Sequence, residues 1–461
     1  ARLIAATAET ATGPTTGFRE RDAESSDGRQ LSLWLVPGLV ALLLLGYGAY
    51  RLTLRVLINN ELAALESRGY PTTLQELNDW YTTPPEDQNA ARVYMEAFQK
   101  LPAPIRERGK FMPFVGDEPP PPTDWRPDGP SEEHIRMYLA EHSEGLELLH
   151  EASRLRRSRY PIDLGEGRDL STPHLSELRR MARVLELDAI MHAIDHRPDA
   201  ATRSIMDALA AARSLEDEPL LLSQTVRMDC QAIAVDALQR ALSLGPLRTQ
   251  DLDRLDRALS RAQQNAGESL KRGFVGQLCF AEVGRGAEDR SGGTGEISVP
   301  RFLYNFGGLH DWDRLRYLEH AGQAIAACEK PGGPDPEAAR AGERREEDLS
   351  GFDRRLTGRA SAITLTLYRQ VGRSVQMDAA RTAMAVERYR MDRGGLPEKL
   401  SEIVPEYVDK VPSDPYDEGR LRYARRAEGY VIYSVGRDRA DGGGKSGARN
   451  MNPDITFAVL R

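Results

Sequence analysis

The longest apolar stretch of the chain covers residues 33–50 and contains no charged side chain. As an α-helix it would span roughly 27 Å, close to the thickness of a bilayer's hydrocarbon core. Trp34 stands near its start, Tyr50 at its end and Arg51 directly after it, and such aromatic and basic residues concentrate at membrane interfaces. The pattern predicts one transmembrane helix over 31–57, with the lipid bilayer as its partner.

After this span, most of the chain places apolar residues at helical spacing. The clearest region contains four predicted helices with short connections, and a proline stands near each helix start, where its fixed φ and missing donor are tolerated. These helices are predicted at 175–195, 199–215, 219–243 and 248–264. Short connections require antiparallel neighbours, so we predict a helical bundle or stacked helix pairs, within a helical domain that covers 58–355.

Three segments lack this pattern. Residues 1–30 show no apolar periodicity, which is typical of a disordered tail. Residues 102–130 are rich in proline, and 330–348 are rich in proline, glycine and charge, so both are predicted to be extended or exposed loops. Thr73 and Glu76, in contrast, have the spacing of a capping box and predict the start of a short helix.

The end of the chain combines a long helix with strands. An apolar row spaced by four residues predicts a helix over 359–392. Alternating residues then predict three strands, at 421–424, 430–435 and 454–460. A long helix against a small antiparallel sheet is an α+β arrangement, which we assign to 356–461. The predicted fold class is therefore mainly α, with the transmembrane helix first and the α+β module last.

Composition excludes several classes of function. The chain has 461 residues, a formal net charge of −8 and 29% charged residues, so no basic surface argues for nucleic acid. Its three cysteines are far apart, which excludes a disulfide framework and a Cys-x-x-Cys metal pair but leaves one disulfide open. Lys445 and Ser446 follow glycines like the end of a phosphate-binding loop, but Arg439 stands where that motif requires its first glycine, so no nucleotide is expected.

A set of motifs near the C-terminus resembles a known family. The motifs follow one another in this order: Glu387-Arg388-Tyr389-Arg390, Gly395-Leu396-Pro397, Val411-Pro412-Ser413-Asp414-Pro415-Tyr416 and Tyr433-Ser434-Val435-Gly436-Arg437-Asp438. They look like the globular, C-terminal half of the major pseudopilin of type II secretion. The resemblance implies a pseudopilin-like module, with a long helix on a three-stranded antiparallel sheet, and a link to a secretion or pilus-like system.

The resemblance also implies a calcium site in the glycine-rich loop 436–453. In that family the loop holds a calcium ion, and the matching positions here are Asp438 and Asp454, with Asp441 nearby. Backbone carbonyls would complete the oxygen shell that a hard cation prefers. The alternative is that these aspartates only form turns, in a loop that ignores metal.

Two departures separate this chain from a pilin subunit. Gly17-Phe18 is followed by Arg19-Glu20-Arg21-Asp22, whose charges cannot enter a bilayer, and the whole helical domain separates the span from the module. We therefore expect no processing or polymerisation as a pilin subunit. The overall layout, with Glu218-Pro219-Leu220 in its helical region, also resembles an uncharacterised family of bacterial single-pass envelope proteins, which brings no known activity.

The position of the span indicates how the protein sits in a bacterial envelope. Arginines stand on both sides of the span in similar number, so the positive-inside balance is almost even. A short tail before an uncleaved signal-anchor usually stays in the cytoplasm. We therefore predict a single-pass protein of the cytoplasmic (inner) membrane with the bulk of the chain extracytoplasmic. The alternative is a signal peptide cleaved near Gly46-Tyr47-Gly48.

One predicted helix carries a candidate zinc site. Asp188, His192 and His196 are spaced by four residues, so on a helix they form one row. Two histidines at this spacing can bind one Zn²⁺, with the carboxylate as a third ligand or as the partner of a ligand. The alternative is a solvated helix end, where histidine favours the helix dipole.

These patterns favour a membrane-anchored bacterial envelope protein with a non-enzymatic, protein-interaction or scaffolding role, and no catalytic residue is assigned. Its expected partners are the bilayer and other envelope proteins. The alternative function is an envelope hydrolase or metal-dependent enzyme housed in the helical domain, with His192 and His196 as its candidate residues.

Overall fold

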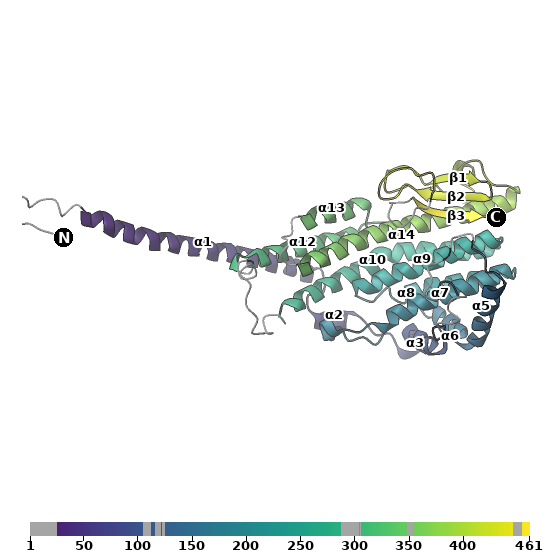
Figure 1. Cartoon of the computed structure of the whole chain (residues 1–461), viewed down its shortest axis with the longest axis horizontal. Coiled ribbons are helices and arrows are strands. Elements are labelled where there is room, and N and C mark those ends of the chain that lie inside the picture. The colour runs from purple at the N-terminus through teal and green to yellow at the C-terminus, as the bar shows by residue number, and fades with distance from the viewer. Residues whose placement is uncertain are drawn as a thin grey trace, which may run out of the picture. The chain divides into compact units, whose positions relative to one another are not determined.

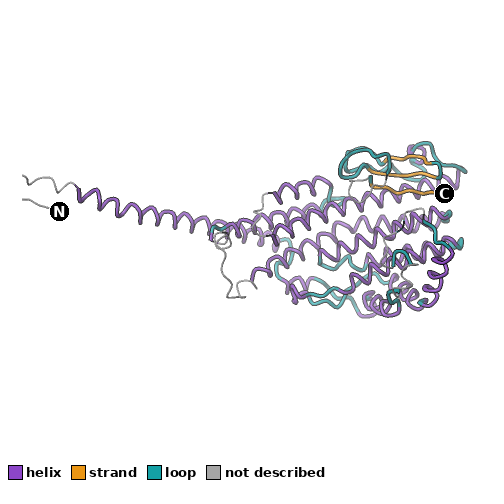
Figure 2. The backbone as a smooth tube through the Cα atoms, in the orientation of Figure 1, coloured by secondary structure: helices purple, strands orange, loops and turns teal. Residues whose placement is uncertain are grey.

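The computed structural model of this chain describes residues 25–104, 112–115, 121, 125–286, 304, 306–347, 354–445 and 454–461. Within these ranges the chain is mainly helical and has one small antiparallel sheet (Figure 2), which confirms the predicted fold class at this level. The chain divides into two compact units, Ala1–Leu57 and Ile58–Arg461.

The first unit contains most of α1 (Ser25–Ser67), a helix of 43 residues that begins before the predicted start at 31. The predicted disordered tail lies outside the described residues up to position 24, and from Ser25 onward the chain is helical. From Leu35, α1 is long and apolar enough to cross a membrane, and none of its most apolar stretch is buried. The part of the chain that the structure describes contains one helix of this kind.

The second unit is a helical body that carries the sheet. Its elements, with η for 3₁₀ helices, are α2 (Leu74–Trp80), η1 (Glu86–Gln88), α3 (Ala90–Lys100), α5 (Gly129–Glu141), α6 (Ser143–Arg154), η2 (Leu164–Asp169), α7 (Pro173–Ile194), α8 (Pro198–Arg213), α9 (Leu221–Leu244), α10 (Thr249–Gly286), α12 (Leu309–Cys328), α13 (Pro336–Glu347), α14 (Arg354–Arg393), η3 (Leu400–Ile403), β1 (Arg422–Arg426), β2 (Gly429–Ser434) and β3 (Ile455–Leu460). The helices α9, α10 and α14 lie side by side, and the sheet packs on α14 (Figure 1).

Local sequence sets the start of several helices. Thr73 and Glu76 form the predicted capping box, in which the Glu76 amide donates to Thr73 Oγ1 at 3.2 Å and the Thr73 amide donates to Glu76 Oε2 at 3.3 Å. Prolines occupy the first turns of α7 and α8. The predicted helices that correspond to α7, α8 and α9 are confirmed to within one turn at each end.

The predicted end of α10 near 264 is wrong. The helix continues to Gly286, because Leu270, Phe274 and Leu278 extend its buried row beyond the glycine at 267. Local composition signals a stop there, but packing of α10 against α9, α12 and α14 overrides it.

The predicted loop at 330–348 is also wrong, since it contains the helix α13. On α13, Ala339 is fully buried, and a Cβ on Gly342 would lie only 2.6 Å from Thr364 Oγ1 of α14. Small residues that look like loop formers in the sequence therefore allow α13 to approach α14 closely. About half of the other predicted loop, at 102–130, lies outside the described residues, and the described half is non-helical up to Asp128, after which α5 begins.

The three strands pair antiparallel in the order β1-β2-β3, with Tyr423 opposite Ile432 and Ile432 opposite Phe457. One face of the sheet packs on α14, where Tyr430, Ile432 and Phe457 are fully buried. The Tyr430 hydroxyl donates to Glu387 Oε1 of α14 at 2.9 Å. The predicted arrangement of a long helix against a three-stranded antiparallel sheet is present.

The sheet also contacts the helices that precede it in the chain. The amides of Ala458 and Leu460 on β3 donate to Gln239 Oε1 and Ser243 Oγ of α9, at 2.7 and 3.1 Å. One hydrophobic core contains buried residues of α7, α9, α14 and the sheet. The predicted domains 58–355 and 356–461 therefore share a core, and only the boundary at 57 coincides with a division between compact units.

A buried carboxylate connects several helices of the body. Glu218, just before α9, has no exposed surface and accepts hydrogen bonds from Ser223, from His174 Nε2 at 2.9 Å and from the Tyr81 hydroxyl at 3.3 Å. His174 stacks on the ring of Tyr160 with 4.3 Å between centroids. The donors come from α7, α9 and the end of α2, so this one group fixes their relative positions.

The same segment continues the polar contacts toward α14. Gln224 donates from Nε2 to the carbonyl oxygens of Leu215 and Glu218, at 2.9 and 2.8 Å. Its Oε1 accepts from Arg227 Nε at 2.7 Å, and Arg227, which is fully buried, reaches Gln370 Oε1 of α14 at 3.0 Å. The segment from Glu218 to Arg227 thus ties the first half of the body to its last helix.

A second buried carboxylate lies on α7. Glu186 has no exposed surface and accepts from Arg183 Nη1 at 2.7 Å, and Arg240 Nε lies 3.4 Å from its other oxygen. Burial, together with the nearby Asp236, raises the pKa of Glu186 to about 7, and both guanidinium groups oppose this shift.

The contact between α10 and the segment before α9 yields a test of the fold. A Cβ on Gly276 would lie 1.7 Å from the carbonyl oxygen of Pro219. We expect Gly276→Ala to lower the free energy of unfolding by about 2–3 kcal/mol, because α10 must move away from a buried backbone segment. Thermal unfolding of the full chain in detergent micelles, followed by circular dichroism, measures the loss.

The matched control is Gly322→Ala on α12, where an added Cβ meets nothing within 4 Å. Higher helix propensity should leave this variant as stable as the natural chain or more stable. Equal melting temperatures for the two variants would contradict the close contact at Gly276.

The pKa of Glu186 predicts a pH dependence of stability. Because burial favours the protonated acid, the folded chain retains a proton that the unfolded chain loses above its ordinary pKa of 4.5, so stability falls as the pH rises from there to about 7. Glu186→Gln removes this titration. Between pH 5 and 8, the natural chain should lose about 2–3 kcal/mol more stability than Glu186→Gln, measured by urea unfolding in detergent. An identical pH profile for both would refute the shift, and exposed Glu151→Gln serves as control.

Candidate functional site

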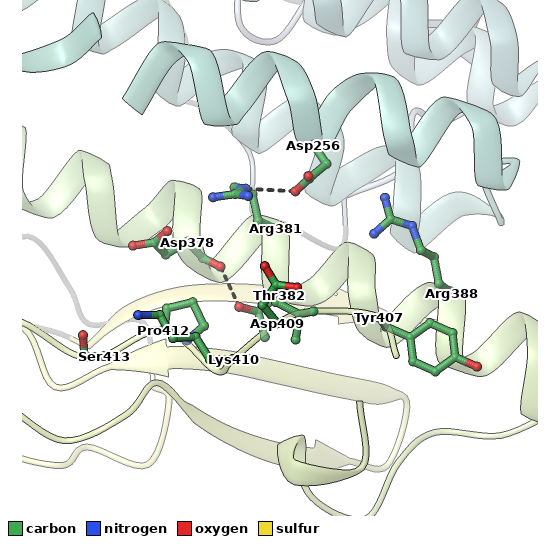
Figure 3. Close-up of a pocket in the computed structure, with 11 residues that line it drawn as sticks. Asp256, Asp378, Arg381, Thr382, Arg388, Tyr407, Asp409, Lys410, Pro412 and Ser413 are labelled. Atoms are coloured by element: carbon green, nitrogen blue, oxygen red, sulfur yellow. Dashed lines mark hydrogen bonds and ion pairs between the residues drawn. The ribbon is translucent and has the colours of Figure 1, made fainter. Parts of the chain in front are cut away.

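A cleft of ≈ 490 Å³ lies between α10, α14 and residues 407–413, which lead from η3 toward β1 (Figure 3). Six of the eleven lining residues carry a charge, and the lining comes from parts of the chain that are far apart in sequence. The lining consists of Asp256 on α10, Asp378, Arg381, Thr382 and Arg388 on α14, and Tyr407, Val408, Asp409, Lys410, Pro412 and Ser413.

The two arginines of the cleft are held in place by α10. Arg381 donates from Nε to Asp256 Oδ1 at 2.9 Å (Figure 3) and from Nη1 to Gln263 Oε1 at 3.3 Å. Arg388 donates from Nη2 to Asp253 Oδ1 at 2.7 Å. Each guanidinium group is fixed at the junction of two long helices, which is a rigid base for recognition of a polar ligand.

Gln263 also orients the third acidic group of the cleft. Its Nε2 donates to Asp378 Oδ1 at 2.9 Å, and the Asp378 carbonyl accepts from the Thr382 hydroxyl at 2.7 Å (Figure 3). Burial raises the pKa of Asp378. The cleft therefore combines fixed arginine–carboxylate pairs with one acid whose negative charge is disfavoured.

The segment 407–413 closes the cleft on the side of the sheet. The amides of Tyr407 and Val408 donate to the carbonyl of Ile403, and the carbonyl of Pro412 accepts from the amide of Leu421 at 3.0 Å. Both ends of the segment are thus attached to the fold.

Between these attachments, Asp409 and Lys410 are exposed and make no ion pair with another described residue. They are the ionic groups of the cleft that are available to a ligand. Their opposite charges, next to two immobilised guanidinium groups, suit a polar ligand and disfavour an apolar one.

The aspartates predicted to bind calcium occupy three different environments. Asp454 is buried, and its two carboxylate oxygens accept the amides of Gly442 and Gly444 at 3.2 and 2.7 Å. Asp438 is exposed and accepts the amide of Ala440 at 3.0 Å. Both act as acceptors that hold turns of the loop.

Asp441 takes part in an ionic network. It accepts the amide of Gly443 at 2.9 Å, the Tyr433 hydroxyl at 3.1 Å and Arg422 Nε at 3.1 Å. These donors already use the oxygens that a cation would need, and no three His, Cys, Asp or Glu side chains of the described residues form a group that could hold a metal ion. Residues 446–453 of the loop lie outside the described residues, and the calcium site stays a prediction.

The sequence did not predict one buried, hydrogen-bonded aspartate of the C-terminal module. Asp414 has no exposed surface, and its oxygens accept from the Ser434 hydroxyl at 2.8 Å, the Val435 amide at 3.0 Å and the Tyr416 amide at 3.1 Å. Arg422 lies 3.3 Å from the same carboxylate. The signal in the sequence was an aspartate between serine and proline in a turn-rich segment, which predicts a turn but not burial.

The structure brings together only part of the predicted zinc site. Asp188 Oδ2 lies 3.4 Å from His192 Nε2 and also accepts from the Ser204 hydroxyl of α8. The helix α7 ends at Ile194, and His196 is exposed beyond it with a left-handed backbone, φ 56°. The predicted row of three residues on one helix is therefore wrong for His196, because the helix stops before it.

The environment of His192 also differs from that of an exposed histidine that is free to bind a metal ion. Burial lowers the pKa of His192, and Asp188 opposes this shift. Next to the pair, His150 of α6 contacts Asp207 of α8. The first histidine–aspartate pair thus lies within α7 and the second joins α6 to α8, and zinc binding stays a prediction.

Comparison with known proteins adds no assignment, since no protein-family model, no curated protein and no solved structure matches this chain.

The hydrogen bonds of Asp454 yield a test of whether the glycine-rich loop is held by Asp454 alone or by a bound calcium ion. Asp454→Ala removes the acceptor of two amides, at Gly442 and Gly444. We expect these amides to exchange hydrogen about fivefold faster or more in EDTA, because loss of a buried acceptor costs about 1 kcal/mol or more. Hydrogen exchange with mass spectrometry measures the change.

The matched control is Asp438→Ala, which removes an exposed acceptor on the same loop and should leave both amides protected. Equal exchange of both amides in the natural chain and in Asp454→Ala, measured in EDTA, would contradict the expectation. If calcium slows exchange in the natural chain and Asp438→Ala abolishes this effect, calcium holds the loop.

Proposed function

We propose that this chain is a membrane-anchored protein of the bacterial envelope that binds other proteins through its Ile58–Arg461 unit, on the outer side of the cytoplasmic membrane. The exposed apolar surface of α1 is the observation that carries the proposal. Four consecutive leucines on α1 are largely exposed: Leu42 66%, Leu43 63%, Leu44 60% and Leu45 73%. Contact with water would be unfavourable by about 25 cal/mol per Å² of such surface, whereas lipid accommodates it.

The end of the apolar stretch within α1 has the chemistry of a membrane interface. Arg51 donates from Nη1 to the Tyr47 hydroxyl at 3.0 Å, and its guanidinium group lies 5.8 Å from the centre of that ring. An arginine with an aromatic ring is a common anchor at the level of the lipid headgroups. This supports a helix that lies across the bilayer, with Tyr47 and Arg51 near one surface.

The body offers two features for protein binding. The cleft between α10, α14 and residues 407–413 presents fixed and free charges at a junction of rigid elements. The adjoining sheet on α14 supports the resemblance of this region to a pseudopilin. We include a pseudopilin-like module, and a link to a secretion or pilus-like system, in the proposal. An assembly role fits better than polymerisation as a subunit, given the charged residues 19–22 and the helical region before the module.

Membrane anchoring and the side of the membrane can be tested together. The natural cysteines Cys230, Cys279 and Cys328 are buried, and burial raises the pKa of each thiol, to about 12 for the first two, so they should react slowly. Ser401→Cys places a thiol at an exposed position. We expect the full chain to stay in carbonate-washed membranes, and this variant to react with a membrane-impermeant maleimide in intact spheroplasts.

The natural chain is the control for background labelling. Leu43→Arg with Leu44→Arg introduces two charges into the apolar stretch and should release the chain from washed membranes, since each charge costs about 2.5–3.5 kcal/mol at the centre of a bilayer. Labelling of Ser401→Cys only after lysis would place the body in the cytoplasm. A natural chain that is soluble after the carbonate wash would refute the anchor.

A further inference from the structure

We propose that the cleft between α10, α14 and residues 407–413 binds a peptide segment of a partner protein that carries an acidic and a basic side chain close together. This inference rests on the proposed function and adds the chemistry of the partner.

The length of the cleft suits a short stretch of extended chain. Its lining on α14 runs from Asp378 to Arg388. At about 1.5 Å per residue of helix, these ten steps measure roughly 15 Å, which four or five residues of extended peptide can span. The cleft is therefore elongated along the helix, as required for a segment of chain that lies parallel to α14.

The charged groups of the cleft that are already paired form its walls but attract a charged ligand only weakly. Arg381 is neutralised by Asp256, and Arg388 by Asp253, each through a hydrogen bond shorter than 3 Å. Asp378 accepts from Gln263, and burial raises its pKa, so it adds a weaker negative charge. These groups line the cleft with polar atoms that exclude an apolar ligand, because such a ligand would leave them unsolvated.

The remaining charges select the partner. Lys410 and Asp409 are adjacent in the chain, exposed, and without an ion pair to any residue that the structure describes. An acidic side chain of the ligand pairs with Lys410, with Nη2 of Arg381 as a further donor, and a basic side chain pairs with Asp409. A segment with a single sign of charge would meet one favourable and one repulsive group at the same rim.

The experiment selects peptides from a phage-displayed library of random dodecapeptides on the purified full chain in lipid nanodiscs. Enriched peptides should carry an acidic and a basic residue close together. Their affinity should fall about tenfold or more for Lys410→Glu, which corresponds to about 1.4 kcal/mol. Replacement of the acidic residue of the peptide by lysine should restore binding to Lys410→Glu and weaken binding to the natural chain.

A second variant and a matched control keep the result independent of folding. Asp409→Lys should give the mirror result, with binding restored when the basic residue of the peptide becomes glutamate. Lys399→Glu makes the same change of charge at an exposed position outside the cleft and should leave affinity unchanged. All three substitutions are at exposed side chains, so melting temperatures should match that of the natural chain.

Several outcomes would overturn the inference. They are enrichment of apolar peptides, no enrichment at all, equal binding to Lys410→Glu, and failure of the exchanged charge to restore binding. Binding of phosphatidylethanolamine vesicles that depends on Lys410, without peptide binding, would assign the cleft to a zwitterionic lipid headgroup instead. These results concern the cleft alone, whereas a soluble chain or a cytoplasmic body would refute the proposed function and leave the charge exchange unaffected.

Discussion

The burial of the Glu218 carboxylate is the constraint on which the rest of the body depends. A carboxylate without exposed surface needs hydrogen-bond donors, because an unpaired buried charge costs several kcal/mol. Its donors belong to Tyr81 after α2, His174 on α7 and Ser223 on α9, which are distant in sequence. Apolar helix faces tolerate small shifts against one another, but these donors reach one carboxylate in only one arrangement of the three segments.

The position of the cleft follows from that arrangement. Gly276 lets α10 rest against the carbonyl of Pro219, next to Glu218, and Arg227 links α9 to Gln370 of α14. The long helices α10 and α14 therefore lie side by side, and the sheet packs on α14 (Figure 1). The hydrogen bonds around Glu218 thus determine where α10, α14 and the segment before β1 meet, although Glu218 and its donors do not line the cleft.

Sequence predicted what local interactions decide. The capping box of Thr73 and Glu76 involves four consecutive residues, and apolar periodicity located α7, α8 and α9. The helix α13 is not predicted, because Gly342 looks like a loop residue and only its contact with α14 explains a glycine there. The predicted row of histidines continues to His196, but α7 ends at Ile194. Asp414 reads as a turn residue, since its burial depends on strands that follow it in the chain.

The cleft could not be predicted for the same reason, although its helices could. Arg381 and Asp256 both fall on predicted helices, but they are 125 residues apart, and nothing local indicates that they meet. Exposed charges such as Asp409 and Lys410 are ordinary on a protein surface. What distinguishes these two is their place beside ionic groups that the fold has already immobilised. A ligand that pairs with them therefore meets a surface that needs little further ordering, so most of the interaction energy remains available for affinity and for discrimination between partners.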